Sequence, residues 1–487
     1  MRLQKGEVMQ KMFPHPLRRL LLVGATALLV SCQVAPSAKQ LTVLYTNDEH
    51  GWMEGMGEAN GAANLMQLWR SEEGYDTQTA NDFLLLSGGD NWTGPAISTW
   101  NQGESMVELM NTMGYTASAV GNHEFDFGLE AIRARSAEAD YAYLSANTTW
   151  AESGRVPEDL GIYDYRIAQA AGLRIGIIGL TTRETATTTN PVTVASLRFA
   201  DYESTLRNLV PRIEAQGVDL LFVISHVCLD ELEPLINEVA DLGIDLVGAG
   251  HCNELVAKRI GDTVLLGGGF HFGSYASARF ELSANGEIKT RFATRANSGA
   301  SEDATTAAIV SRWREQSAAA LSEVLGFVAA EVPRGPRLDQ LVVDSWLRAD
   351  PSAQVAITNA GGIRAPLLAG QVTLGDTVAI LPFDNTLVVV EISGADLLAV
   401  LAEGSRPRVA GLMQRGGEWT EIDSGERVAP GKQYRVLVNS FMYAGGDGYE
   451  RLALADPEGY DTGIQYGEPF REWLRSLASS EQTPAAL

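Results

Sequence analysis

Short apolar runs alternate with amphipathic segments from Leu41 to about Leu282, and this alternation constrains the fold more than any other feature. The β-branched or apolar runs have the length of buried strands and lie at residues 41–45, 82–87, 118–120, 173–180, 219–225 and 244–249. Segments with helical spacing, such as 104–113 and 203–216, lie between them. Alternating strands and helices form layered α/β domains in which helices cover a buried sheet. The sequence therefore predicts an α/β domain over residues 41–300.

A second region follows, as expected for a chain of 487 residues, which is too long for one ordinary core. The alanine-rich segment 303–326 has helical spacing throughout and is predicted to be a connecting helix. Further apolar runs lie beyond it, at residues 354–358, 386–392 and 434–438. We therefore expect a linker helix at 301–326, a smaller α/β (α+β) domain at 327–475 and a tail at 476–487.

The charge balance bears on the class of partner. The chain has 37 lysines and arginines against 61 aspartates and glutamates, a net charge of −24. Nucleic-acid polymers require a basic face, so the composition argues against such a partner. A small anionic substrate is still compatible, because local arginines or metal ions outweigh the global field. No feature of the sequence indicates an obligate protein partner.

The N-terminus has the pattern of a targeting segment. Basic residues up to Arg19 precede the apolar run 20–30, which is too short to span a bilayer. The run ends in LVSC, and this resembles the bacterial lipoprotein signal, in which the cysteine is lipidated and becomes the new N-terminus. An ordinary secretory signal is the alternative. The resemblance implies a signal peptide at 1–31, a tether at 32–40 and an exported, periplasm-facing or cell-surface protein anchored only through lipid at Cys32.

Only Cys228 and Cys252 remain after that cysteine. Two cysteines do not make a disulfide framework, and no C-x-x-C motif occurs. They would be able to pair in an oxidising compartment. We expect them instead to be small, buried, unpaired residues.

Side chains that bind metals follow five of the predicted strands. Open α/β sheets bind ligands at the carboxyl ends of their strands, where these residues lie. A single aspartate there is usually a turn residue or a helix cap. However, four of the six histidines share this setting, whereas His15 lies in the signal segment and His271 in a glycine-rich loop. The candidate ligands are Asp48, His50, Asp90, Asn122, His226, His251 and Asn253, and His123 lies beside Asn122 in the same setting.

The mixture of imidazole, carboxylate and amide groups suits Zn, Mn or Fe better than an all-oxygen calcium site. Seven residues fill the eight ligand positions of two ions only if one residue bridges, and a carboxylate is the best bridge. A shared carboxylate holds two ions roughly 3.5–4 Å apart, the separation used for in-line attack at phosphorus. The pattern favours a dinuclear site.

These motifs resemble those of the calcineurin-like metallophosphoesterases. Their spelling, TNDEHG, SGGDNW, GNHEFDFG and GHCN, resembles the 5′-nucleotidase branch, which includes bacterial periplasmic UDP-sugar hydrolases. The resemblance implies a four-layer β-sandwich flanked by helices and two divalent ions (Zn, Mn or mixed) bridged by Asp90. One ion is then held by Asp48, His50 and Asp90 with Asn253 nearby, and the other by Asp90, Asn122, His226 and His251. The wider superfamily usually has histidine where this chain has Asn253, so direct coordination by that residue is the weakest assignment.

The second region carries motifs of the same family. ITNAGGIR (357–364), ILPFDN (380–385) and NSFMYAGGDGYE (439–450) resemble its C-terminal substrate-binding domain. The resemblance implies that Phe383 and Phe441 stack on a nucleobase, each ring being worth about 1–3 kcal/mol. Asp447 would accept hydrogen bonds from ribose, and Asn359 and Arg364 would contact the nucleotide. Arg334 matches another family arginine, although RGPRLDQ departs from the usual pattern and Arg337 competes for the role.

The implied activity is metal-dependent hydrolysis of nucleotide phosphate esters, releasing nucleoside and phosphate without a covalent intermediate. His123 would stabilise the transition state or protonate the leaving oxygen, with Asp126 orienting its ring. Related sites also hydrolyse UDP-sugars or 2′,3′-cyclic nucleotides. Alternatives of another class are a non-catalytic nucleotide-binding surface lipoprotein and a metal-storage protein. Family members swing the C-terminal domain, which makes segment 303–326 the expected hinge region.

Adjacent residues of an extended segment point in opposite directions. On that basis Asn122 is expected to face an ion and His123 to face the substrate, with Asp126 behind it. Glu124 is expected to be solvated or structural, and Phe125 to pack in the core.

Overall fold

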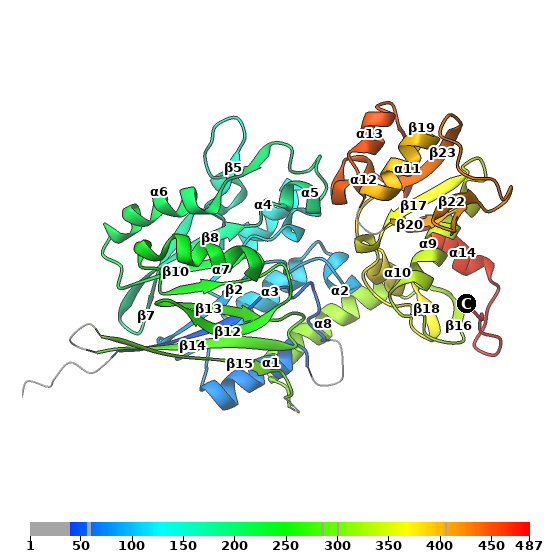
Figure 1. Ribbon diagram of the computed structural model, residues 1–487. Coiled ribbons are helices and arrows are strands. Elements are labelled where there is room, and N and C mark those ends of the chain that lie inside the picture. The colour runs from blue at the N-terminus through cyan, green and yellow to red at the C-terminus, as the bar shows by residue number, and fades with distance from the viewer. Residues whose placement is uncertain (1–38, 56–59, 284–286, 300, 405–406) are drawn as a thin grey trace, which may run out of the picture. The chain divides into compact units, whose positions relative to one another are not determined.

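Two mixed sheets form the N-terminal part of the computed structural model, which describes residues 39–55, 60–283, 287–299, 301–404 and 407–487 (Figure 1). The predicted signal peptide and Cys32 lie outside these residues. The first sheet has the order β15-β14-β1-β2-β3-β4-β6. Its strands are β1 (Lys39–Thr46), β2 (Phe83–Ser87), β3 (Ala117–Ala119), β4 (Ala142–Leu144), β6 (Ile162–Tyr163), β14 (Ser274–Leu282) and β15 (Ile288–Ala296). β1 thus includes Lys39 and Gln40, which the sequence placed in the tether.

The second sheet has the order β12-β13-β11-β10-β8-β7. β8, β10, β11 and β13 run parallel, and β7 and β12 are antiparallel edge strands. The bounds are β7 (Tyr165–Ala170), β8 (Leu173–Thr181), β10 (Leu220–His226), β11 (Leu246–Gly248), β12 (Leu255–Ile260) and β13 (Thr263–Gly268). A separate two-stranded ribbon pairs β5 (Thr148–Trp150) with β9 (Leu197–Phe199).

Alternation along the strands builds the layers, since successive side chains of a strand point to opposite faces. In β10, Phe222 and Ile224 pack with Val43 and Tyr45 of the first sheet. The intervening Val223 packs instead against helices α6 (Tyr202–Glu214) and α7 (Leu229–Glu238), which cover the outer face of the second sheet (Figure 1). The central strands of the second sheet are therefore buried on both faces.

The first sheet is covered on its other face by helices that supply a second core. This core contains Trp69 and the buried methionines of α3 (Glu104–Met113). The other helices of this part are α1 (Ala62–Leu68), α2 (Ala96–Thr99), α4 (Leu129–Glu138) and α5 (Thr185–Thr188). The order helix, sheet, sheet, helix is the four-layer architecture expected from the sequence, and the α/β fold class is confirmed.

The remaining chain begins with the long helix α8 (Ala304–Leu321), capped by Asp303, whose side chain accepts from the backbone N–H of Thr306. A five-stranded sheet follows, of order β20-β17-β23-β19-β24. Its strands are β17 (Val355–Asn359), β19 (Thr386–Ser393), β20 (Pro407–Ala410), β23 (Gln433–Asn439) and β24 (Tyr460–Gln465). Two apolar clusters lie on its two faces, one including Trp346 and Phe470 and the other including Leu397 and Tyr449.

Helices and short ribbons complete this region. The helices are α9 (Pro336–Ala349), α10 (Leu374–Ile380), α11 (Gly394–Glu403), α12 (Ser440–Tyr443), α13 (Arg451–Ala455) and α14 (Glu468–Ser476). The ribbons pair β16 (Val324–Val328) with β18 (Gly370–Thr373), and β21 (Leu412–Arg415) with β22 (Glu418–Glu421). Among all the described helices, none combines the length and the apolar character that crossing a membrane requires.

Candidate active site

The loops after β1, β2, β3 and β11, together with the last residue of β10, His226, bring the predicted metal-binding side chains together, although the strands belong to two sheets. Several of these residues have left-handed backbone conformations that only glycine adopts without cost. The φ angles are 56° for Asp48, 45° for His50, 56° for Asp90 and 72° for His251. Such conformations cost about 1–3 kcal/mol each and cluster at functional sites.

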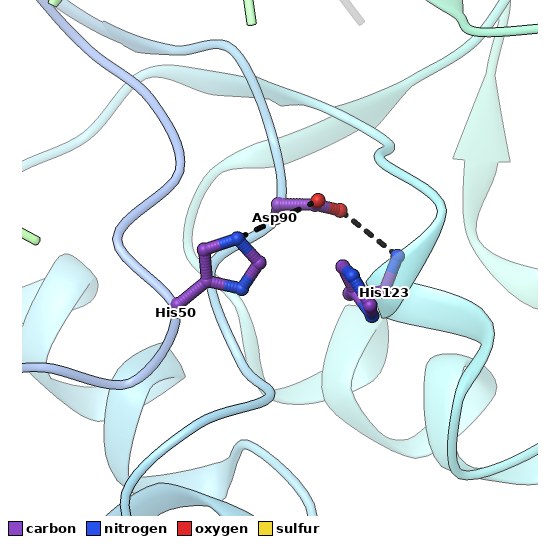
Figure 2. A group of neighbouring side chains, drawn as sticks. All are labelled: His50, Asp90 and His123. Atoms are coloured by element: carbon purple, nitrogen blue, oxygen red, sulfur yellow. Dashed lines mark hydrogen bonds and ion pairs between the residues drawn. The ribbon is translucent and has the colours of Figure 1, made fainter. Parts of the chain in front are cut away.

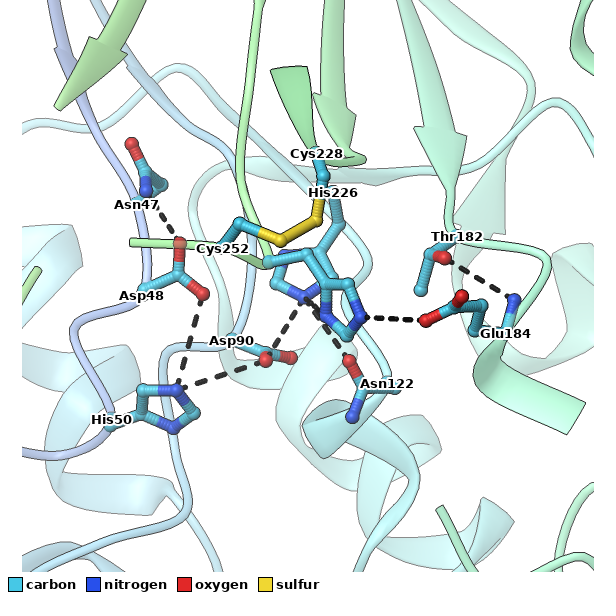
Figure 3. Close-up of a disulfide and its surroundings, with 11 residues drawn as sticks. Asn47, Asp48, His50, Asp90, Asn122, Thr182, Glu184, His226, Cys228 and Cys252 are labelled. Carbon is cyan, nitrogen blue, oxygen red and sulfur yellow. Dashed lines mark hydrogen bonds and ion pairs between the residues drawn. A yellow bond between two sulfur atoms is a disulfide. The ribbon is translucent and has the colours of Figure 1, made fainter. Parts of the chain in front are cut away.

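Two imidazoles are oriented by backbone carbonyls. Nδ1 of His50 donates to the carbonyl of Thr93 (3.1 Å), and Nδ1 of His226 donates to the carbonyl of Gly88 (2.8 Å). Because Nδ1 of each ring donates to a carbonyl, Nε2 is the nitrogen left to face the site, the arrangement of a metal-binding histidine whose other nitrogen is fixed by a second partner. Nε2 of His226 lies 2.9 Å from Oδ2 of Asp90, and Nε2 of His50 lies 3.8 Å from the same oxygen (Figure 3).

Asp90 is at the centre of two groups that meet the spacing of a metal site. One group is His50, Asp90 and His123, and the other is Asp90, His226 and His251. In each, the potential ligand atoms lie within 4.8 Å of one another. Asp90 is the carboxylate common to both groups, and it is the residue to which the family resemblance gives the bridging position.

The site concentrates buried acids. Burial raises the pKa of Asp48 to about 7, and the neighbouring charge of Asp90 adds to that effect. Burial would also raise the pKa of Asp90, but the histidines, led by His226, hold it well below its usual range. Burial lowers the pKa of His226, yet the Asp90 carboxylate outweighs this and raises it to about 9. Buried carboxylates of this kind need positive charge beside them.

One further observation indicates that these residues fit divalent ions. Oδ1 of Asp48 is buried and has no hydrogen-bond partner, while Nδ2 of Asn47 donates to the other oxygen, Oδ2. A buried carboxylate oxygen without a donor is costly unless a cation binds it. Imidazole nitrogens and carboxylate oxygens are the ligands of Zn and Mn sites. The residues present therefore fit a metal centre.

His123 and Asp126 form a hydrogen-bonded pair beside these groups. Nδ1 of His123 donates to Oδ2 of Asp126 (2.6 Å), and the His123 backbone N–H donates to Oδ1 of Asp90 (2.9 Å; Figure 2 shows the latter bond). Burial lowers the pKa of His123, but Asp126 and Asp90 together raise it above its usual value.

The prediction that GNHEFDFG is extended was wrong in detail. Residues His123–Phe125 form one turn of 3-10 helix, which the backbone of Asn122 enters with φ −74° and ψ −30°. Consecutive side chains still diverge on a helical turn. Oδ1 of Asn122 lies 3.2 Å from Nε2 of His226, whereas the His123 ring stacks on that of Phe383 (ring centroids 5.8 Å apart).

Gly121 is required just before this turn. A Cβ atom at that position would collide with Oδ1 of Asp90, the oxygen that His123 holds. The glycine therefore allows the backbone to pass directly over the carboxylate.

A cavity of about 340 Å³ opens onto the cluster. Most of the predicted site residues line it, including both members of the His123–Asp126 pair. Those from the metal group are His50, Asp90, Asn122, His251 and Asn253, and those from the C-terminal region are Asn359, Arg364, Phe383, Phe441 and Asp447. Asp48 and His226 lie behind the lining, and Arg334 is not among the lining residues.

Hydrogen bonds preorganise one side of this cavity. Nδ2 of Asn439 donates to Oδ1 of Asn359 (3.1 Å), and Nδ2 of Asn359 donates to Oδ2 of Asp447 (2.7 Å). Asp447 has a left-handed φ of 55°. The guanidinium of Arg364 lies over the Phe383 ring, 5.9 Å from its centroid. Carboxylate, aromatic and guanidinium groups thus share the same wall.

Comparisons with known proteins agree with these motifs. Residues 324–454 match the family model described as "5′-nucleotidase, C-terminal domain". A 5′-nucleotidase from Vibrio cholerae is 26% identical over 94% of this chain and 96% of its own length. The chain is therefore similar to 5′-nucleotidases over nearly its whole length.

Solved structures of this family and its relatives share the fold. A 5′-nucleotidase precursor from Thermus thermophilus superimposes with a TM-score of 0.74 at 23% identity, over 91% of this chain and 97% of that one. A calcineurin-like phosphoesterase from Bacillus subtilis, at 17% identity and a TM-score of 0.50, covers 57% of this chain and 98% of its own. The 5′-nucleotidase architecture thus extends over nearly the whole described chain.

The two cysteines are paired, and the expectation that they are unpaired was wrong. Cys228 and Cys252 form a disulfide with a Cα–Cα distance of 5.3 Å. They follow β10 and β11, which are neighbouring parallel strands, so their carboxyl ends lie side by side. Sequence spacing did not reveal this proximity, since it depends on strand order.

Glu124 is structural rather than solvated. Its carboxylate is fully buried and accepts from the backbone N–H groups of Asp90 (2.9 Å), Asn91 (2.7 Å) and Gly121 (2.7 Å). Phe125 is buried in the core, as expected.

Three further residues contact the site but are given no role by the sequence motifs. Asn47 ties Asp48 to the end of β13 through the backbone of Gly268 and Gly269. Thr189 donates to Oδ1 of Asp126 (3.1 Å). His271 stacks on Trp52 (ring centroids 5.0 Å apart), and its ring centroid lies 5.8 Å from that of His50. His271 lies in a glycine-rich loop, and its sequence context predicts no role for it.

Proposed function

We propose that this chain is a phosphoric monoester hydrolase of the 5′-nucleotidase type that releases nucleoside and phosphate from nucleotides using divalent metal ions. One observation carries the proposal. The imidazoles of His50 and His226 are both turned by backbone carbonyls so that Nε2 faces the same oxygen of Asp90. Two imidazole nitrogens that converge on one carboxylate oxygen have the arrangement of a shared metal-binding group.

Two ions, Zn, Mn or a mixed pair, are proposed to bind around Asp90. Divalent ions there lower the pKa of a water molecule and neutralise charge on the phosphoryl oxygens. The proposed ligands are Asp48, His50, Asp90, Asn122, His226 and His251, with Asn253 nearby. Asn253 lines the cavity and has a left-handed φ of 60°. Both features support placing it beside the metal ligands.

His123 is proposed to act on the leaving oxygen. Asp126 accepts from Nδ1, so the ring is fixed and Nε2 is the nitrogen left to meet the substrate. A raised pKa favours the protonated imidazole, which is the form that donates a proton or stabilises negative charge.

The C-terminal residues of the cavity are proposed to hold the nucleoside. Phe383 and Phe441 offer aromatic faces for the base, and base stacking contributes about 1–3 kcal/mol per base. The Asp447 carboxylate accepts from ribose hydroxyls, and Asn359 fixes its orientation. Arg364 provides the charge that a phosphate requires. Arg334 is proposed as a weaker contributor, because it does not line the cavity.

The division of the chain is part of the proposal. We assign residues 41–300 to a metallophosphoesterase domain, 301–326 to a linker and 327–475 to a substrate-binding domain. Residues 1–31 are proposed as a lipoprotein signal peptide, with Cys32 as the lipidated residue of an exported, periplasm-facing or cell-surface protein. Labelling cells with a radioactive fatty acid tests this, since Cys32→Ala should abolish incorporation.

Phosphate release by the protein without residues 1–38 tests the activity. AMP, ATP, UDP-glucose and 2′,3′-cyclic AMP are compared with Mn or Zn present, and bound metal is measured in parallel. AMP hydrolysis is expected, with loss of both metal and turnover in Asp90→Ala. A preference for UDP-glucose or the cyclic nucleotide would redirect the substrate assignment. No turnover on any substrate would contradict the enzyme, and full activity in Asp90→Ala would contradict the dinuclear site.

A further inference from the structure

The disulfide between Cys228 and Cys252 lies directly beside two candidate metal ligands (Figure 3). Cys228 is two residues after His226, and Cys252 immediately follows His251. The bond therefore joins the two loops that carry the histidines of one metal group, Asp90, His226 and His251.

The two ends of the disulfide differ in how firmly they are held. Cys228 is buried and precedes α7, where its carbonyl accepts from the backbone N–H of Leu232 (3.1 Å). Cys252 is exposed, in a loop where the flanking residues His251 and Asn253 both have left-handed φ angles, 72° and 60°. The bond thus ties a strained, exposed loop to a firmly packed one.

The two histidines also differ. The ring of His226 is fixed by the carbonyl of Gly88, whereas no backbone carbonyl among the described residues accepts from the ring of His251. Its ring nitrogens face only Nε2 of His226 (3.2 Å) and the exposed carboxylate of Glu184 (3.4 Å). The position of the His251 ring therefore depends on the backbone of its own loop.

We propose that the disulfide is a positioning device, holding the loop 250–253 so that His251 completes the metal group it shares with Asp90 and His226. This inference rests on the proposed function, because it assumes that the group binds an ion. The other group, His50, Asp90 and His123, has no residue on this loop, and the loop residue Asn253 is only proposed to lie near the ion of that group. Loss of the disulfide should therefore weaken the ion beside His251 more than the other ion.

Metal binding by the Cys228→Ala/Cys252→Ala variant tests this directly. Apoprotein is dialysed against a series of buffered Mn or Zn concentrations, and ions per chain are measured by atomic emission. Changes around a ligand typically cost 10- to 100-fold in metal affinity. We expect one ion to bind with wild-type affinity and the other about 10- to 100-fold more weakly, as in the reference variant His251→Ala.

A matched control separates positioning from general stability. Ile213→Val removes one methylene from a fully buried side chain of α6, which packs on the same sheet away from the site. It should lower the unfolding temperature without changing either affinity. The single variant Cys252→Ala leaves the buried Cys228 in place and keeps the test available if the double variant folds poorly.

The outcomes are distinct. If the double variant loses stability but keeps both affinities, the disulfide is only structural and the proposal is overturned. If both ions weaken equally, the selective role of the His251 loop is wrong. If the wild-type protein binds no ion at all, the proposed function fails, whatever the cysteine variants do.

Discussion

Asn122 and His123 are neighbours in the chain, but their side chains have different partners. Oδ1 of Asn122 faces the His226 ring, and His123 is bonded to Asp126. We predict that His123→Ala lowers kcat by roughly 10²- to 10⁴-fold, the usual contribution of a general acid, with metal content near normal. Asn122→Ala should instead weaken one ion by about tenfold or more.

Steady-state kinetics combined with metal analysis checks this division. His123 also lies within ligand distance of His50 and Asp90. The metal content of the His123→Ala variant is therefore the informative quantity. Equal loss of metal in both variants would show that His123 is a ligand and that the division is wrong.

Thr189 is also predicted to act through another residue. Its hydroxyl donates to the oxygen of Asp126 that His123 does not use. Thr189→Val keeps the shape and removes the donor, so we expect kcat to fall roughly 2- to 10-fold with KM unchanged, the effect of one lost hydrogen bond. Thr189→Ser should restore the rate.

The neighbouring Thr188→Val is the control for this measurement. Its hydroxyl donates to the carbonyl of Glu184, outside the His123–Asp126 pair, although the residue lines the same cavity. A fall in kcat of the same size in both valine variants would remove Thr189 from its positioning role.

At the scale of elements, Glu124 joins the loops after β2 and β3. Its carboxylate accepts three backbone N–H groups, two from the Asp90 loop and one from Gly121. Burial, followed by the nearby charge of Asp90, raises its pKa to about 7. Glu124→Ala leaves these buried donors without partners, so we predict a loss of about 3 kcal/mol or more in the free energy of unfolding.

Urea unfolding monitored by circular dichroism measures this loss. Glu130→Ala serves as the control, since Glu130 is exposed and its partner Arg133 is about half exposed. Such surface pairs contribute about 0–1 kcal/mol. A Glu124→Ala variant as stable as this control would show that the three hydrogen bonds do not hold the loops.

Elements were largely predictable because burial on both faces leaves a simple pattern. The runs at 41–45 and 173–180 fall within β1 and β8, the run at 219–225 overlaps all of β10 but its last residue, and the helical segment 104–113 coincides with α3. Division of the strands between two sheets was implied only by the family resemblance. A continuous apolar run indicates that a strand is buried, but it does not indicate which sheet the strand joins.

Metal removal tests the molecule as a whole. Ions that bind the folded state alone stabilise it by about 2.7 kcal/mol per site at a concentration 100 times the dissociation constant. Without them, the buried carboxylates of Asp48 and Asp90 lose their positive partners. We therefore predict that a chelator lowers the unfolding temperature and that added Mn or Zn restores it.

Differential scanning calorimetry with and without chelator measures the shift, and Asp90→Asn is the control. That variant lacks the proposed bridging carboxylate, so its unfolding temperature should respond little to chelator. A wild-type protein whose unfolding is unaffected by chelator would contradict resident metal ions.

The residue types of the candidate site can be recognised in the sequence alone. Each of the loop motifs carries ligand-type side chains, and their spelling resembles that of the 5′-nucleotidases. Even Asp90 was singled out as the shared carboxylate, because ligand types and family motifs are local properties of the chain.

The contacts that orient these site residues are visible only in the tertiary structure. The Cys228–Cys252 bond, the Thr189 hydroxyl on Asp126 and the carbonyls that orient His50 and His226 join residues far apart in the chain. Such contacts depend on the order of strands and the path of loops. Local sequence patterns report burial and residue chemistry, whereas these supporting partners are fixed by which strands become neighbours.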